Sequence, residues 1–143
     1  MNQTNIVQML ENAVYRHSRY IERCKIVLKR ISKEKKLDKL NEGLSNLVKL
    51  SKRLEEILRL INNSLSLENL TIEEIESIAI MTFYIYEVSI EEERILWLRY
   101  SRELSDEHHL EDVNMHLMRL DRLKNVAKEV LENVEKCSAF LSR

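Results

Sequence analysis

Residues 37–65 read LDKLNEGLSNLVKLSKRLEEILRLINNSL. Leucine and isoleucine recur in this run in alternating steps of three and four residues, and one serine takes a place in the row. Such spacing, kept over four heptads, is typical of a helix that packs along one apolar seam. The seam consists of Leu37, Leu40, Leu44, Leu47, Ser51, Leu54, Leu58, Ile61 and Leu65.

Apolar residues continue with similar spacing on both sides of this run, which predicts further helices. Four long helices with short connections are typical of a helical bundle. We therefore expect a single all-α domain covering residues 1–143, folded as an antiparallel four-helix bundle. The expected helices span about 4–33, 37–62, 71–104 and 106–141.

The predicted connections follow from local capping signals. Residues 62–69 break the apolar spacing and end just before Thr71, whose side chain can cap a helix together with Glu74 in a capping box. Similar patterns at Ser89 and Ser105 predict further helix starts. Gly43 lies inside the second helix, where it costs about 1 kcal/mol relative to alanine.

The composition excludes several fold classes. The chain has one glycine and no proline in 143 residues, so the usual residues of β-turns and phosphate-binding loops are missing. This counts against sandwiches, barrels, Rossmann folds and loop-built active sites. No signal peptide or membrane span is visible, and two cysteines predict free thiols in a reducing, cytoplasmic setting.

Charge is unevenly distributed, although the formal net charge is only −1. Residues 1–63 carry 14 basic and 7 acidic side chains, whereas residues 64–115 carry 3 basic and 13 acidic ones. The basic residues within 16–39, together with Tyr20, could attract the phosphates of a nucleic acid. The other interpretation is that basic and acidic helices pack side by side and neutralise each other.

The run from Ile78 to Ile90 is apolar nearly all round the helix, which predicts extra apolar surface for a partner. Our leading hypothesis is a non-enzymatic bundle, structural or regulatory, that acts through association with a protein partner or with itself as a homodimer. We expect no catalytic residues, no cofactor, no small-molecule substrate and no membrane. The candidate interface residues are Ile78, Met81, Phe83, Tyr84, Tyr86 and Ile90.

Histidines and cysteines offer little chemistry at their spacing. His109, Asp112 and His116 share one helix face, but His17 is expected to lie about 20 Å away from them in height, so we predict no metal site. Cys24 and Cys137 are similarly separated along the bundle. Both lie on apolar seams, where we expect them to act as small core residues.

Residues 92–105 read EERILWLRYSRELS. This run resembles the opening of the sigma-factor region 4 helix-turn-helix, which also occurs in small phage-type transcription activators, and the similarity extends over 92–131. The resemblance implies a turn at 114–116 and an alternative function as a DNA-binding transcription regulator using residues 91–131. The implied DNA contacts are Arg119, Arg122, Lys124 and Lys128.

A second alternative comes from the pair Arg102 and His108, an Arg-x5-His spacing. It resembles the loose signature of HEPN ribonucleases, which are small helical bundles. The resemblance implies that Arg102 would bind a phosphate and His108 would act as general acid or base. In style alone, this proline-free composition resembles accessory and virion proteins of thermophilic archaea and their viruses.

Overall fold

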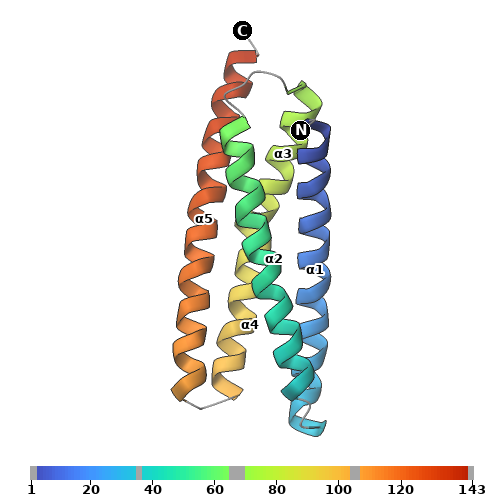
Figure 1. Cartoon of the computed structure of the whole chain (residues 1–143), viewed down its shortest axis with the longest axis vertical. Helices are drawn as coiled ribbons and strands as arrows, with labels where there is room; N and C mark the ends of the chain where they lie inside the picture. Colours follow the sequence, from blue (N-terminus) through green and yellow to red (C-terminus); the bar gives the residue numbers. More distant parts are fainter. Residues whose placement is uncertain (1–2, 35–36, 65–69, 104–106, 142–143) are drawn as a thin grey trace.

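The computed structural model shows an all-α bundle, as predicted (Figure 1). It describes the backbone of residues 3–34, 37–64, 70–103 and 107–141, with side chains over 6–29, 40–63, 70–102 and 112–137. The elements are α1 (Gln3–Glu34), α2 (Leu37–Ser64), α3 (Ile72–Tyr84), the π-helical turn η2 (Ile85–Ser89), α4 (Ile90–Glu103) and α5 (Glu107–Leu141).

The elements α3, η2 and α4 follow one another without a gap and form a single rod, the third helix of the bundle. Consecutive helices run in opposite directions, as predicted (Figure 1). Not every pair of packed helices is consecutive in the chain. Helix α1 packs against α2 and the rod, and α5 also packs against α2 and the rod. As a result, α1 runs parallel to the rod beside it, and α2 runs parallel to α5.

The apolar seams predicted from the sequence form the core. Along α2 the seam is buried from Leu40 to Ile61, including Ser51, whose hydroxyl donates to the Leu47 carbonyl at 2.9 Å. Because Ser51 satisfies its hydroxyl within its own helix, it fits an apolar seam without a partner from another helix. On α1 a similarly spaced row of apolar residues is buried, and His17 is buried within it; the apolar members include Ile6, Leu10, Ile21, Cys24 and Leu28.

The start of the rod agrees with the predicted capping box. The Glu74 N–H donates to Thr71 Oγ1 at 3.2 Å, and the Thr71 N–H donates to Glu74 Oε1 at 3.1 Å. The predicted loop at 62–69 is partly wrong, because α2 continues to Ser64; residues 65–69 lie outside the described part. The predicted start at Ser105 also lies outside the described residues.

The break in the third helix that the pattern at Ser89 indicated coincides with a π turn, Ile85–Ser89, through which the rod continues into α4 at Ile90. The Ile90 N–H donates to the Ile85 carbonyl, five residues back. This turn inserts one residue and changes the helix phase: a regular 3-4 repeat through Ile85 and Ser89 would bring Glu92 into the core, whereas Glu93 is buried instead. The insertion therefore decides which glutamate enters the bundle.

The turn at 114–116 implied by the helix-turn-helix resemblance is absent. Helix α5 runs through Asn114 and His116 as one α-helix of 35 residues. In a continuous helix, the backbone N–H and C=O groups of residues 114–116 form the regular hydrogen bonds between residues four apart. Neither glycine nor proline interrupts the helix here. The crossing of two short helices that this motif requires is therefore not formed.

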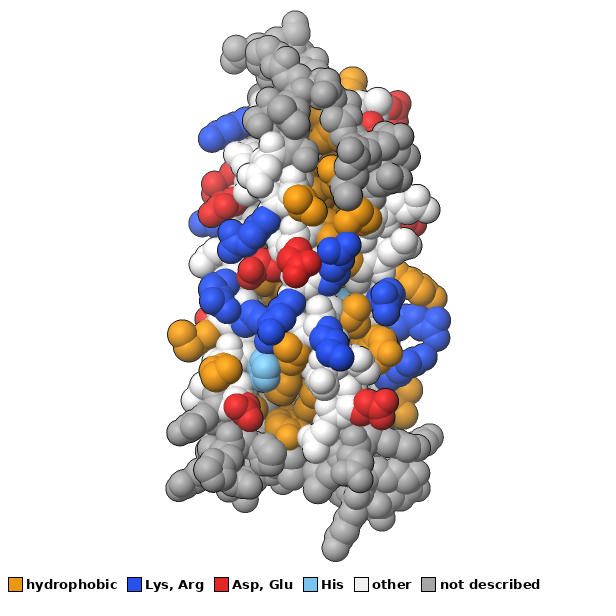
Figure 2. All heavy atoms as spheres, in the orientation of Figure 1, with side chains coloured by type: hydrophobic (Ala, Val, Ile, Leu, Met, Phe, Trp, Pro, Cys, Tyr) orange, Lys and Arg blue, Asp and Glu red, His pale blue; other side chains and the backbone are white. Residues whose placement is uncertain are grey.

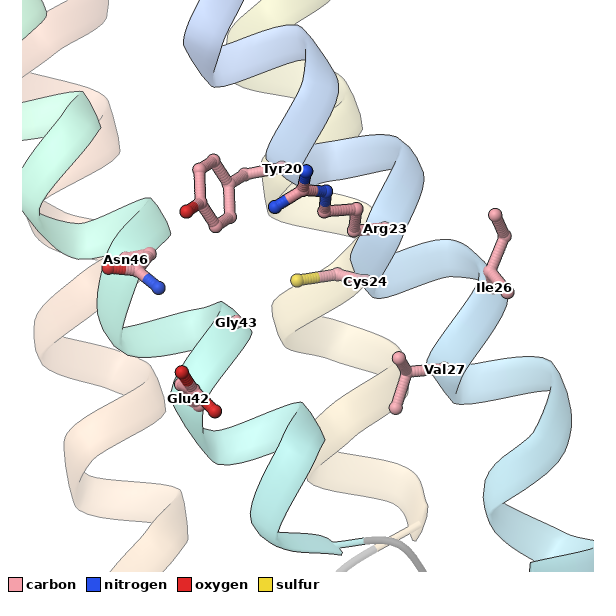
Figure 3. A pocket seen from close by; sticks show the side chains of 8 residues that line it. All are labelled: Tyr20, Arg23, Cys24, Ile26, Val27, Glu42, Gly43 and Asn46. Atoms are coloured by element: carbon pink, nitrogen blue, oxygen red, sulfur yellow. The ribbon is translucent and has the colours of Figure 1, made fainter.

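Gly43 marks a close approach between α1 and α2, and Figure 3 shows the Cys24 thiol directed towards it. A Cβ atom added to Gly43 would lie 2.9 Å from Cys24 Sγ, which is closer than real Cβ contacts. The glycine therefore serves helix packing, a role that its cost in helix propensity alone does not reveal. Burial, together with the charge of Glu93, raises the pKa of the Cys24 thiol to about 12, so this cysteine stays protonated.

Candidate functional site

Two features stand out in the described part of the bundle: a buried polar cluster around Glu93, and a row of exposed apolar side chains on α1 and the rod. In the cluster, His17 Nε2 lies 2.6 Å from Glu93 Oε1 and joins α1 to α4. The Trp97 indole N–H donates to Glu93 Oε2 at 2.9 Å. His17 and Glu93 are fully buried, so these contacts replace water around the carboxylate.

Helix α5 completes the cluster with a cation. Arg119, which is 7% exposed, places Nη2 3.7 Å from Glu93 Oε2 and supplies the opposite charge. Its Nη1 donates to His116 Nδ1 at 2.7 Å, and the His116 ring stacks on Trp97 at 4.2 Å between centroids. Because Arg119 can only donate, His116 Nδ1 accepts and its proton sits on Nε2.

The protonation state of His116 follows from its surroundings in this cluster. Burial, followed by the charge of Arg119, lowers the pKa of His116, which favours the neutral ring that the hydrogen bond requires. The cluster is only partly satisfied, because His17 Nδ1 and the Nε and Nη2 atoms of Arg119 are buried without a hydrogen-bond partner among the described residues. The His17–Glu93 bond fixes the height of α1 relative to the rod, and Arg119 does the same for α5.

The structure corrects the expected separation of the histidines. His17 and His116 both belong to this cluster, His17 through its bond to Glu93 and His116 through its stacking on Trp97. Glu93 and Trp97 connect the two histidines, which we had expected to be too far apart in height to share a site. Within the described residues, no group of three or more His, Cys, Asp or Glu side chains is placed to hold a metal ion.

Most of the exposed large apolar residues lie on α1 and the rod, and we call the surface around the groove between these helices the association face. The groove between the two helices, about 580 Å³, is lined by Tyr15, Ile80 and Tyr84 among others. Further along, Ile26 on α1 points away from α2 (Figure 3). The exposed apolar residues of the groove are Tyr15 (60% exposed), Ile80 (71%) and Tyr84; Ile26 (51%), Phe83 (56%) and Ile95 (54%) are exposed elsewhere on the same two helices.

The interface prediction is therefore partly wrong. Ile78 and Ile90 are fully buried in this chain's own core, and Met81 and Tyr86 are half-buried. The run 78–90 is apolar all round because the rod contacts both α1 and α5. Phe83 and Tyr84 remain exposed, and the sequence prediction missed Ile80, although it lies within the same run.

The predicted DNA contacts do not form one surface. Arg119 is buried in the cluster, which contradicts its predicted exposure. Lys124 lies over the Tyr86 ring at 4.9 Å and is 3.5 Å from Glu91, so it links α5 to the rod. Arg122 and Lys128 are exposed.

Basic side chains gather over the middle of the face drawn in Figure 2, with acidic ones among them. The exposed basic residues of the chain include Arg16 and Arg23 on α1 and Lys49 on α2. Arg23 lies over the Tyr20 ring at 5.1 Å. On the other side of α1, Lys25 pairs with Glu92 of the rod at 3.3 Å, so part of the basic segment does neutralise the acidic one.

The ribonuclease prediction falls only partly on described residues. Arg102 is exposed at the end of α4, whereas the side chain of His108 lies outside the described part. Among the described residues, no helix is long and apolar enough to cross a membrane. Comparison with protein-family models, with curated proteins and with solved structures finds no match to this chain.

Proposed function

We propose that this chain is a non-enzymatic helical bundle that acts by associating with a protein through the association face. The observation that carries the proposal is the groove between adjacent helices that the exposed Tyr15, Ile80 and Tyr84 line. Single exposed apolar residues are common on protein surfaces, but neighbouring aromatic and branched ones around a groove are typical of interaction sites.

The core supports the same function by making the face rigid. The His17–Glu93 bond connects the two helices that carry the face, and the Lys25–Glu92 pair connects them again further along. A rigid face loses little conformational entropy on binding, which favours affinity. The buried cluster therefore positions the binding surface without touching the partner.

A photo-reactive amino acid at position 80 tests the proposal in the cells that produce the chain. The matched control is position 118, because Met118 is 68% exposed and apolar but lies on α5, away from the association face. We expect a discrete cross-linked species from position 80 and none from position 118. Equal cross-linking from both positions, or none from position 80, would overturn the proposed function.

A further inference from the structure

We propose that the association face binds a basic amphipathic helix of another protein. This inference rests on the proposed function, because it names the chemistry of the partner that the same face binds. It is carried by two properties of the groove between α1 and the rod: its walls are apolar and helical, and its charged edge is acidic without a basic counterpart.

The walls of the groove come from two helices that pack against each other. Tyr15 on α1 and Ile80, Met81 and Tyr84 on the rod line it, and its volume is about 580 Å³. Because a helix satisfies its own backbone N–H and C=O groups, these walls offer no strand edge to an extended peptide. An amphipathic helix binds differently, by placing its apolar side chains in such a groove.

Charge is one-sided along this part of both helices. Residues 1–15, which lead into the groove on α1, contain no lysine or arginine, and neither do residues 70–93, which include its wall on the rod. The first basic residues after Tyr15 are Arg16 and Arg19, and neither lines the groove. The Arg19 guanidinium lies over the Tyr15 ring, 5.7 Å from its centroid. The groove therefore contains no base of its own.

Two exposed carboxylates border these apolar walls. Glu11 lines the groove beside Tyr15, and Glu76 lies one turn before Ile80 on the same side of the rod. Neither glutamate has a lysine or arginine three or four residues away on its own helix, where helical ion pairs form. A lysine or arginine of a partner is the counter-ion that this edge lacks.

Several other acids of the described surface are neutralised within the chain. Arg53 pairs with Glu56 at 3.2 Å, and Arg94 pairs with Asp121 at 2.7 Å. The groove differs from these sites, since it combines apolar walls with carboxylates that have no such base. Exposed aromatic rings such as that of Tyr84 also attract cations. The groove is thus complementary to a helix with apolar residues on one side and lysine or arginine beside them.

Fluorescence anisotropy with two labelled synthetic peptides tests this complementarity on the purified full chain. One peptide of about 18 residues carries leucine on one helix face and lysine on the other, and its counterpart carries glutamate in place of lysine. We expect the leucine–lysine peptide to bind with a Kd at least about tenfold lower. Equal affinities, or tighter binding of the glutamate peptide, would overturn the inference.

A pair of charge reversals shows whether the attraction belongs to the groove. Glu76→Lys should raise the Kd of the leucine–lysine peptide by about fivefold, whereas Glu135→Lys on α5 should leave it within about twofold. The two sites match closely, because each glutamate is exposed, follows another glutamate by three residues and has no base three or four residues away. An equal rise in Kd for both variants would indicate attraction to the chain as a whole and would overturn the inference.

The apolar contribution has its own matched pair. Ile80→Asn should raise the Kd of the same peptide by about tenfold or more, because it removes apolar surface that the peptide buries. Met118→Asn changes a similarly exposed side chain on α5 and should have no effect. Circular dichroism checks that all of these surface variants are folded. An unchanged Kd for Ile80→Asn would overturn the inference.

The cross-link from position 80 separates this inference from the proposed function. Mass spectrometry of the cross-linked species identifies the attached segment, which we expect to have a net positive charge and apolar residues at helical spacing. Attachment to a segment without net positive charge, or to a second copy of this chain, would overturn the basic helix and leave association with a protein in place. Absence of any cross-link would overturn both.

Discussion

Glu93→Gln removes the charge at the centre of the buried cluster and keeps the side-chain shape. Glu93 accepts hydrogen bonds from His17 and Trp97 and faces Arg119, so all of its neighbours are donors or cations. An amide group replaces one acceptor oxygen with a donor and leaves the Arg119 charge buried without compensation. Removing one partner of a buried ion pair costs about 3–5 kcal/mol.

The neighbouring Glu92→Gln is the matched control. Glu92 is about one-third exposed and forms one surface ion pair, with Lys25. Such pairs contribute about 0.2–1 kcal/mol. The two substitutions are chemically identical and adjacent on α4, so a difference of about 2 kcal/mol or more between them reports the burial that the π turn gives to Glu93.

Urea unfolding at one low protein concentration compares both variants under the same conditions. Trp97 is the only tryptophan, and it lies in the cluster, so its fluorescence reports local opening while far-ultraviolet circular dichroism reports the whole bundle. A total stability of about 7–20 kcal/mol is expected for this length. Equal midpoints for Glu93→Gln and Glu92→Gln would refute the assigned role of Glu93.

Three further outcomes are expected. Gly43→Ala should destabilise the bundle by about 0–2 kcal/mol, because crowding against Cys24 Sγ outweighs the better helix propensity of alanine. In a Cys24→Ala background, the same substitution should stabilise the bundle by about 1 kcal/mol. Additive effects of the two substitutions in a double-mutant cycle would contradict the close contact. The folded pKa of His116 lies below its ordinary value of 6.5, so the unfolded chain binds the proton first and stability should fall as pH drops below about 6.5. Urea midpoints from about pH 8 to about pH 5 should show a shallower decline for His116→Gln than for the wild type, and identical profiles would count against this linkage. In a Cys137→Ser background, Cys24 should react with a thiol reagent only as fast as the chain unfolds, because the thiol is buried and its pKa is about 12; fast labelling of the folded chain would disprove this.

The spacing of apolar residues was sufficient to predict the fold, because each seam is a property of one helix. Leu40 to Ile61 and the capping box at Thr71 appear in the structure as their spacing indicates. The π turn was not predictable in this way, since Ser89 followed by Glu92 has the same local pattern as a helix start. Without the phase change, the regular repeat points to Glu92 rather than Glu93 as the buried residue.

The candidate site depended on contacts between helices, which no single seam specifies. The His17 position in an apolar seam was the one sequence signal for the cluster, and it did not indicate a partner 76 residues away. Arg119 looked like an exposed basic residue because its burial depends on where α5 meets Glu93. The sequence predicted that Ile78 and Ile90 would contact a partner, because it does not show that two other helices of the same chain cover the rod.

Cross-linking from position 80 tests the association of this chain with a protein most directly. A photo-reactive side chain there replaces Ile80, which is 71% exposed and lines the groove between α1 and the rod, whereas the control at position 118 replaces Met118, which is 68% exposed on α5. A discrete cross-linked species from position 80 and none from position 118 is the predicted result. Equal cross-linking from both positions, or none from position 80, would contradict the account.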